Sequence, residues 1–329
     1  MCTSLTLKSE DNKNFLARTM DFPLAFDESV HLIPRDFKWY SVADKKEQKS
    51  KYASLGMSVV MNNHPILADG VNEKGLCVAT LYFPGFAHYE KNLSEDKINL
   101  APYDFVYYAL ANCSDLEEVS EMVKNVEFID VSLSFLGLTP PLHWIVTDRS
   151  GKSITIENTI DGLKITDNQI GVMTNSPEIG WHFTNLRQYI GVKPTQNNPV
   201  NWAGLDLSAF SQGGGTFSIP GDYTPPSRFV RAAYLKSVSV LAKDEIDGVT
   251  SLFHILANCE VPKGAVLKDG KELDFTLYTA AMCSESCTYY YKTYENSQIS
   301  AISMSNEDLN RKDIKAFENK RKQKIECQN

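Results

Sequence analysis

The second residue of the chain is a cysteine, and this position offers chemistry that an internal cysteine lacks. A small residue after the initiator allows Met1 to be trimmed, which would leave Cys2 with a thiol and a free α-amine on the same Cα. An α-amine titrates near pH ~8 and a thiol near ~8.5, so the two groups can act as general base and nucleophile. This residue alone leaves open the alternative that Cys2 is merely a small residue near the start.

The segments that follow predict a β-hairpin that positions this cysteine. Residues 2–7 alternate between polar and apolar side chains, which is typical of a half-buried strand. Residues 11–14 (Asp-Asn-Lys-Asn) favour a turn, and residues 15–22 form the returning strand. The end of the second strand, near Asp21, is therefore expected beside Cys2.

Arg18 and Asp21 are the charged residues that this hairpin would bring to Cys2. An arginine beside a thiol favours the thiolate, and a carboxylate can hold an ammonium group. Residues three apart point to opposite faces of a regular strand. We therefore expect a bulge or bend near Thr19 and Met20 if both side chains reach Cys2. The alternative is a surface ion pair or a pair of solvated charges.

The composition is that of an ordinary globular protein of 329 residues, long enough for one large domain or two of average size. The formal net charge is −8 and no long basic run occurs, which argues against binding to nucleic acid or to an anionic membrane. No apolar run approaches the ~18 residues of a membrane span, and no signal peptide is recognisable. The seven cysteines are scattered and odd in number, which favours reduced thiols in a cytoplasmic protein.

The rest of the chain alternates between groups of strands and pairs of helices. Periodicity and turn residues predict strands at 30–34, 76–83, 142–147, 153–157, 163–166, 171–174, 275–282, 288–292 and 298–304. Helices are predicted at 102–113, from a capping box at Ser114, from Ser227 and from Asp247, with loops at 44–51 and 211–224. This order predicts one α+β domain over residues 1–329, two stacked antiparallel sheets covered by helices, and a charged peripheral tail from about 305 to 329.

Three residues outside the hairpin also have side chains suited to a catalytic site. Asn175 follows a strand at a turn, where its amide could donate to an oxyanion, although turn geometry also explains an asparagine there. Arg228 stands at the start of a predicted helix, where a positive charge opposes the helix dipole and suggests another use. Tyr82, near the end of a central strand, could line a pocket or simply belong to the core.

Other arrangements are weaker. His143 or His254 could serve as a base for an internal cysteine such as Cys77, as in papain-like hydrolases, but both histidines stand in apolar segments typical of structural residues. Residues 283–287 carry two cysteines without the second ligand pair of a zinc site, so no metal is expected. Glycines 213–215 lack the context of a phosphate loop and favour a flexible or ligand-covering loop.

Six ordered segments carry a resemblance to a known family. They are Met-Cys-Thr-Ser (1–4), Ala-Arg-Thr-Met-Asp-Phe (17–22), Asp-Gly-Val-Asn-Glu-Lys-Gly (69–75), Pro-Pro-Leu-His-Trp (140–144), Gly-Val-Met-Thr-Asn-Ser-Pro (171–177) and Pro-Gly-Asp-Tyr-Thr-Pro-Pro-Ser-Arg-Phe (220–229). Together they resemble the choloylglycine hydrolase family of N-terminal-nucleophile hydrolases, which includes conjugated bile acid hydrolases and penicillin V acylases. The similarity runs over essentially the whole length.

The resemblance implies a cysteine amidohydrolase that acts on small N-acyl amides through a thioester acyl-enzyme, without metal or organic cofactor. Cys2, freed of Met1, would be the nucleophile, and its own amine, through a water, the proton carrier. Arg18 and Arg228 would lie near the thiolate.

By the same resemblance, Asp21 would bind the terminal amine, and Asn175 with the backbone N–H of residue 82 would form the oxyanion hole. The family fold is a four-layer αββα sandwich, and its members are commonly homotetramers. Residues 185–217 would then be the assembly region.

Two departures predict the branch of the family. The bile-salt branch typically has Asn where this chain has Tyr82, and Arg-Asn before the Asp motif where this chain has residues 18–20 as Arg-Thr-Met. Both departures resemble the penicillin V acylase branch. Tyr82 also adds an aromatic face that suits stacking on a phenoxyacetyl-type acyl group. We therefore predict a penicillin V acylase with Met20 and Tyr82 binding substrate and loops at 57–64 and 129–138 forming the pocket walls. The alternatives are a conjugated bile salt hydrolase and, from another class, a non-catalytic acyl-ligand-binding homologue.

Overall fold

The N-terminal hairpin forms as predicted and becomes the centre of an antiparallel sheet. The computed structural model describes residues 1–329, and β1 (Cys2–Lys8) pairs with β2 (Asn14–Phe22) so that Cys2 lies opposite Met20. This six-stranded sheet has the order β14-β1-β2-β19-β20-β21. Its other strands are β14 (Val172–Met173), β19 (Phe275–Cys283), β20 (Thr288–Thr293) and β21 (Asn296–Ser303).

A second antiparallel sheet of eight strands lies against the first. Its order is β13-β12-β11-β8-β7-β6-β3-β22. The bounds are β13 (Gly162–Asp167), β12 (Ser153–Thr159), β11 (Leu142–Thr147), β8 (Cys77–Tyr82), β7 (His64–Asn72), β6 (Ser54–Met61), β3 (Ser29–Ile33) and β22 (Lys315–Phe317). Buried side chains such as Leu16 on β2 and Leu81 on β8 form the core between the two sheets.

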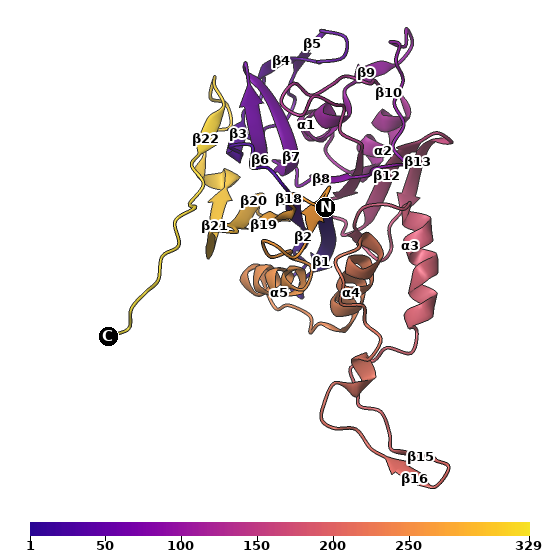
Figure 1. Cartoon of the computed structure of the whole chain (residues 1–329). Helices are drawn as coiled ribbons and strands as arrows, with labels where there is room; N and C mark the ends of the chain where they lie inside the picture. Colours follow the sequence, from indigo (N-terminus) through magenta and orange to yellow (C-terminus); the bar gives the residue numbers. More distant parts are fainter.

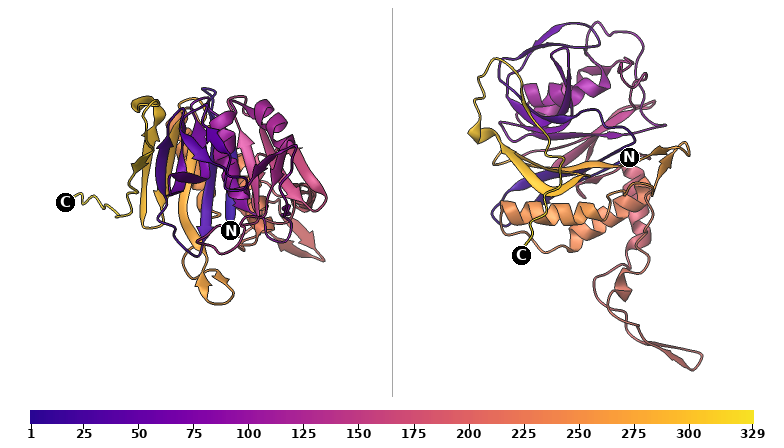
Figure 2. Two further views of the ribbon diagram at one scale, coloured as in Figure 1. Left: turned by 90° about the horizontal axis from the view of Figure 1, so that it is seen from above. Right: turned by 60° about the vertical axis from the view of Figure 1, so that its left-hand side comes forward.

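Helices cover the outer face of each sheet, which gives four layers (Figures 1 and 2). The helices over the eight-stranded sheet are η1 (Pro102–Asp104), α1 (Phe105–Asn112) and α2 (Leu116–Lys124), and Phe105 packs there against Trp144. The six-stranded sheet is covered by α4 (Pro225–Val238) and α5 (Glu245–Ala257), with Phe15 and Phe229 in the intervening core. The predicted αββα sandwich is confirmed.

Several predicted boundaries are wrong, for local reasons. The second helix is capped by Asp115 rather than Ser114, because the Asp115 carboxylate accepts the Glu118 N–H. Helix α5 begins after Asp244, which caps in the same way, so Asp247 lies inside it. Helix α4 begins at Pro225, whose fixed φ suits a first helical position, so Ser227 is also inside its helix.

Some elements were not predicted at all. Strands β6 and β7 and helix α3 (Ile179–Asn185) stand where no strand or helix is predicted. The segment 44–51 was predicted as a loop, but it contains the exposed strand β5 (Glu47–Lys49), which pairs with β4 (Lys38–Tyr40). The charged tail is peripheral only in part, because β22 pairs with β3 at the edge of the large sheet.

The remaining elements are short and lie outside the layers. They are β9 (Ile98–Leu100) with β10 (Val126–Phe128), η2 (Leu186–Tyr189), β15 (Val200–Trp202) with β16 (Leu205–Leu207), η3 (Gly214–Thr216), β17 (Leu267–Lys268) with β18 (Glu272–Leu273), and η4 (Met304–Asn306). The β15–β16 hairpin ends an arm that projects away from the layers (Figure 1). None of the helices combines the length and hydrophobicity needed to cross a bilayer.

Candidate active site

Cys2 is the first residue of β1 and is buried. The residue is 4% exposed, and its Sγ accepts a hydrogen bond from Arg18 Nη2 at 3.0 Å. Its backbone N–H donates to Asn175 Oδ1 at 2.9 Å. The thiol and the amino end of Cys2 are therefore held by different residues.

Arg18 and Asp21 both lie beside Cys2, but no bend of β2 is needed to bring them there. The expected bulge near Thr19 and Met20 is absent, since β2 stays in register with β1. The irregularity lies instead on the facing strand β19, between residues 276 and 278. Successive side chains of β2 point to opposite faces of the sheet. Arg18 therefore lies on the same face as the Cys2 thiol, and Asp21 lies on the other face.

Asp21 holds the amino end of the chain with its backbone. Its carbonyl accepts a hydrogen bond from the Met1 amino group at 2.6 Å, and its N–H donates to the Met1 carbonyl at 2.9 Å. The Asp21 carboxylate accepts hydrogen bonds from the hydroxyls of Thr276 at 2.6 Å and Thr19 at 3.3 Å. Burial raises the pKa of this carboxyl, while the nearby amino terminus and Arg228 act in the opposite direction.

Asn175 links β1 and β8. Its Nδ2 donates to the Tyr82 carbonyl at 2.7 Å, and its Oδ1 accepts from Cys2 N and from Arg228 Nη2, the latter at 2.7 Å. An amide with both ends held in this way has a defined orientation. Asn175 therefore stands within hydrogen-bond reach of both Cys2 and the end of β8.

Arg228 is fully buried in the first turn of α4, and its charge is used by neighbouring oxygens. Its Nη1 donates to the Cys2 carbonyl and to Thr3 Oγ1, the latter at 2.7 Å, while its Nε donates to the Tyr223 carbonyl at 2.9 Å. Burial lowers the pKa of Arg228. These contacts explain a positive charge at a helix end that otherwise disfavours it.

Two buried histidines hold the turn that carries Asn175. His143 Nε2 lies 3.0 Å from the Thr174 carbonyl, and His182 Nε2 lies 3.1 Å from the Asn175 carbonyl. Burial lowers the pKa of both rings, that of His182 to about 4, so the His182 ring is neutral and its Nε2–H donates to the Asn175 carbonyl. His143 also pairs with the buried Glu157 at 3.3 Å. No sequence signal marks His182 for this role.

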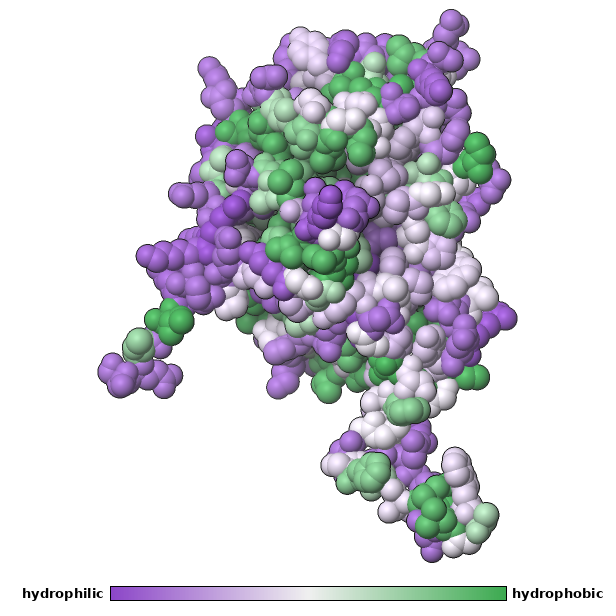
Figure 3. Space-filling view, viewed as in Figure 1, coloured by the Kyte–Doolittle hydropathy of each residue, from purple (hydrophilic) through white to green (hydrophobic).

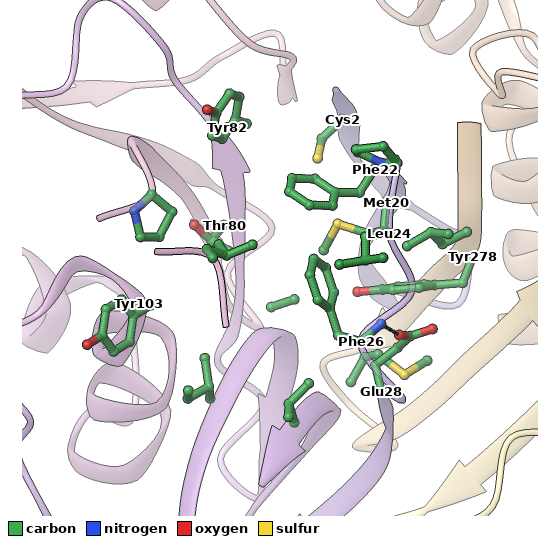
Figure 4. A pocket seen from close by; sticks show the side chains of 18 of the residues that line it. Cys2, Met20, Phe22, Leu24, Phe26, Glu28, Thr80, Tyr82, Tyr103 and Tyr278 are labelled. Atoms are coloured by element: carbon green, nitrogen blue, oxygen red, sulfur yellow. Dashed lines mark hydrogen bonds between the residues drawn. The ribbon is translucent and has the colours of Figure 1, made fainter. Parts of the chain in front are cut away.

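An apolar cavity of about 670 Å³ opens beside Cys2 (Figure 4). It is lined by 31 residues, of which 22 are hydrophobic, and Met20 and Tyr82 are among them. Seen from outside, apolar residues gather on this face of the molecule, above and below a hydrophilic projection (Figure 3). A pocket of this volume and character suits a small molecule with a large apolar part.

The cavity walls agree only in part with the prediction. The predicted wall at 129–138 contributes Leu133, Phe135, Leu136 and Leu138. The predicted segment 57–64 also contributes to the wall, through residues 57–59, but these residues belong to strand β6 and not to a loop. Two further walls were missed, the segment from Phe22 to Glu28 and residues 263–277 around the β17–β18 hairpin.

The alternative centres do not assemble. Cys77 is buried next to the Ser284 hydroxyl, and burial raises the pKa of its thiol well above the ordinary value. His254 is exposed on α5, and His143 is engaged with Glu157 and Thr174, so neither serves Cys77. No group of three or more His, Cys, Asp or Glu side chains could hold a metal ion. Glycines 213–215 lie at η3, within the projecting arm.

The combined geometry suits attack on a carbonyl carbon. A thiol touches a guanidinium, an orientated amide lies at the other end of the same residue, and an apolar cavity can seat an acyl group. Together these three parts favour nucleophilic addition by a thiolate to a bound acyl group.

Comparison with known proteins agrees with this chemistry. A family model described as linear amide C-N hydrolases, choloylglycine hydrolase family, matches residues 2–317. A bile salt hydrolase/transferase from Clostridium perfringens is 42% identical over 318 residues, which cover 96% of each chain. A crystal structure of a mutant conjugated bile acid hydrolase from the same organism superposes with a TM-score of 0.94 over 100% of both chains, at 40% identity. A penicillin V acylase from Pectobacterium atrosepticum is 26% identical, covering 89% of this chain and 78% of its own.

Proposed function

Because the chain belongs to the choloylglycine hydrolase family of linear amide C–N hydrolases, we propose that it cleaves the amide bond of conjugated bile acids. One observation carries the proposal: the Cys2 thiol, already paired with a guanidinium, stands at the wall of an apolar cavity of about 670 Å³. Such a cavity can take an acyl group that is both large and mostly apolar. The amide carbonyl of the same substrate would then lie at Cys2.

In the proposed mechanism, removal of Met1 frees the Cys2 amine. The thiolate adds to the amide carbonyl. The oxyanion that forms is stabilised by the backbone N–H of residue 82 and by the Asn175 Nδ2 hydrogen that does not bond the Tyr82 carbonyl. The C–N bond then breaks, and the departing amine takes a proton from the Cys2 ammonium, directly or through a water. Water attacks the resulting thioester, which releases the acid and restores the thiol. An amine in place of water would transfer the acyl group, the second activity in the name of the Clostridium perfringens relative.

The residues around the amino end support this assignment. Cys2 N lies 2.9 Å from Asn175 Oδ1, and the backbone of Asp21 lies against Met1. A free amine at Cys2 would keep the Asn175 acceptor and would gain the Asp21 carboxylate as a countercharge. Arg18 would favour the thiolate, and Arg228 would hold the Cys2 carbonyl.

This proposal replaces the penicillin V preference predicted from Tyr82. The bile salt hydrolase relative is 42% identical over almost the whole chain, whereas the penicillin V acylase is 26% identical. Penicillin V hydrolysis remains the second candidate activity, since Tyr82 lines the cavity and offers an aromatic face to an aryl acyl group. A non-catalytic binding homologue is disfavoured, since every side chain that the mechanism needs is present.

The test is a side-by-side hydrolysis assay with glycocholate, taurocholate and penicillin V, on protein whose N-terminus has been established by intact mass. We expect both bile salts to be cleaved faster than penicillin V by protein that lacks Met1. Protein that retains Met1 serves as the matched control and should be inactive, because the base is locked in a peptide bond. Cleavage of penicillin V alone would restore the first prediction, and activity on none of the three would refute the proposed substrate class.

We further propose that the projecting arm at residues 185–217 joins copies of the chain into the homotetramer implied by the family resemblance. Its side chains Trp202, Phe210 and Phe217 are apolar and more than two-thirds exposed, at 71%, 110% and 85%. Exposed apolar groups gathered on one projection are typical of an interface. A reducing cytoplasm is the proposed compartment, in keeping with seven cysteines that are all free thiols.

A further inference from the structure

Asp69 on β7 is a fully buried carboxylate beside the site, and the mechanism above gives it no role. Its Oδ2 accepts hydrogen bonds from Arg18 Nη1 at 2.9 Å and from the Tyr278 hydroxyl at 2.6 Å. Its Oδ1 accepts a hydrogen bond from the Tyr289 hydroxyl. Three donors on β2, β19 and β20 of one sheet therefore converge on a single carboxylate of the other.

Arg18 connects this carboxylate to Cys2. Its Nη2 donates to Cys2 Sγ at 3.0 Å, and its Nε donates to the Thr19 carbonyl at 2.9 Å. A guanidinium is planar and its donors form a fixed fork, so holding Nε and Nη1 directs Nη2. Arg18 is 0% exposed and needs a countercharge, which the contact with Asp69 supplies.

We infer that Asp69, held by Tyr278 and Tyr289, is a positioning residue that aims Arg18 at the Cys2 thiol and moderates the positive field there. The inference rests on the proposed function only in taking Cys2 as the nucleophile. A buried guanidinium without a carboxylate partner would stabilise a thiolate more strongly. A more strongly stabilised thiolate is a weaker nucleophile, so the carboxylate keeps the sulfur reactive.

Other charged and titratable groups near this cluster come from several elements and stay unchanged in the test. They are the Met1 amino group, Asp21 at the end of β2, Glu28 before β3, Tyr82 on β8, Arg228 on α4 and Cys259 after α5.

The decisive variant is Asp69→Asn, which keeps the shape of the side chain and removes its charge. We expect the midpoint of Cys2 alkylation by iodoacetamide against pH to fall by about one pH unit, because the field of Arg18 is no longer offset. We also expect kcat for glycocholate to fall at least about tenfold, with KM within about threefold of wild type. Peptide mass spectrometry assigns the alkylation to Cys2 among the seven cysteines.

The matched control is Glu73→Gln, which removes a carboxylate just after β7 that pairs with Arg35 and does not line the cavity beside Cys2. It should keep the wild-type alkylation midpoint and kcat. A second variant, Tyr289→Phe, removes one hydrogen bond to Asp69 and leaves its charge in place. It should lower kcat about threefold or more while the alkylation midpoint stays within about 0.3 pH units of wild type.

The inference would be overturned if folded Asp69→Asn protein kept both the alkylation midpoint and the kcat of the wild type. It would also be overturned if the loss of activity equalled the loss of folded protein. If Asp69→Asn does not fold, a folded Tyr289→Phe protein with wild-type kcat would overturn it instead. The alkylation profile needs no substrate. Failure of the proposed function, seen as no hydrolysis by the wild-type chain, is therefore distinguished from failure of the role assigned to Asp69.

Discussion

Cys2 lies between two fully buried arginines that reach it from opposite faces of the hairpin. Arg18 contacts the sulfur, whereas Arg228 contacts the carbonyl of the same residue and shares Asn175 Oδ1 with its N–H. The alternation of a β-strand separates the two tasks, one face for the thiol and the other for the backbone. Each arginine therefore acts on a different part of one residue.

The first prediction concerns the sulfur itself. Cys2→Ser should lower turnover by about a hundredfold or more, because a serine hydroxyl is a much poorer nucleophile at neutral pH. The serine is nearly isosteric, so the thermal unfolding midpoint should stay within a few degrees of wild type. Steady-state kinetics and a thermal melt on the same preparation check both points. A near-wild-type rate would mean that another residue attacks the amide.

The second prediction concerns Tyr82, which lines the cavity next to the reacting centre (Figure 4). Tyr82→Asn removes an aromatic face, so the ratio of penicillin V to glycocholate turnover should fall about threefold to tenfold. Competition assays with both substrates in one vessel measure the ratio directly. Phe86, a nearby aromatic residue that does not line the cavity, offers a control as Phe86→Asn. An unchanged ratio in Tyr82→Asn would assign the preference to the other walls.

At the scale of elements, strands β6 and β7 bring Asp69 to the site through an unusually close contact. Gly56 on β6 pairs with Gly70 on β7, and a Cβ at Gly56 would lie 2.1 Å from the Asp69 carbonyl oxygen. The pairing shifts between Met57 and Ser58, directly after this contact. The small residue and the irregularity together set the position of the buried carboxylate.

The third prediction follows from that contact. Gly56→Ala should destabilise the fold by roughly 1–3 kcal/mol and lower kcat, because the backbone at Asp69 must move to make room for the methyl group. Gly180→Ala is the matched control, since a Cβ there meets nothing within 4 Å. Denaturant unfolding of both variants gives the comparison. Equal stability of the two proteins would show that β6 and β7 adjust without cost.

The fourth prediction concerns the turn before α3, which His182 holds through the Asn175 carbonyl. The pKa of His182 falls from 6.5 in the unfolded chain to about 4 in the fold because the ring is buried. Between these values the unfolded chain binds more protons, so the free energy of unfolding should fall as pH drops from about 6.5 to about 4. The loss from this group is roughly 2 kcal/mol at pH 5.

His182→Gln tests this assignment, because glutamine keeps a donor at the position of Nε2 and does not titrate. Between pH 7 and pH 5, the free energy of unfolding of His182→Gln should fall by roughly 2 kcal/mol less than that of the wild type. Urea unfolding at the two pH values provides the measurement. Parallel pH dependence in both proteins would remove His182 as the source.

At the scale of the whole molecule, the two sheets close the site from both sides while the arm stands apart from it. Cys2 and Arg18 belong to one sheet, and Asp69 and Tyr82 belong to the other. The arm leaves the layers near α3 and ends at the β15–β16 hairpin (Figures 1 and 2). The arm therefore contributes no side chain to the cavity wall.

The fifth prediction concerns this arm. Trp202→Glu with Leu205→Glu should convert the assembled protein into a species near the 36.9 kDa of one chain, because both apolar side chains are largely exposed in the isolated chain. Light scattering after size-exclusion chromatography measures the mass. The control Ile160→Glu changes an equally exposed residue on a turn outside the arm and should leave the assembly intact. An unchanged mass in the double variant would locate the interface elsewhere.

Much of the fold was predictable because its signals are local. Alternating strands, turn clusters and helical periodicity lie within a few residues of one another, so the N-terminal hairpin and the order of strands and helix pairs could be predicted. Strands β6 and β7 were missed because their apolar residues are interrupted by glycines and by the turn at Asn62 and Asn63, which weakens the pattern. Their strand character comes from pairing with β3 and β8.

The sequence by itself determined which residue could be the nucleophile and which groups its hairpin brings beside it, since Arg18 and Asp21 are linked to Cys2 by a short local turn. Only the tertiary structure decided what faces that hairpin from afar. Arg18 meets Tyr278 across 260 positions because β19 pairs with β2, and it meets Asp69 across 51 positions because the two sheets stack. The cavity walls, the histidines behind Asn175 and the carboxylate behind Arg18 depend on that stacking, and no local pattern encodes it.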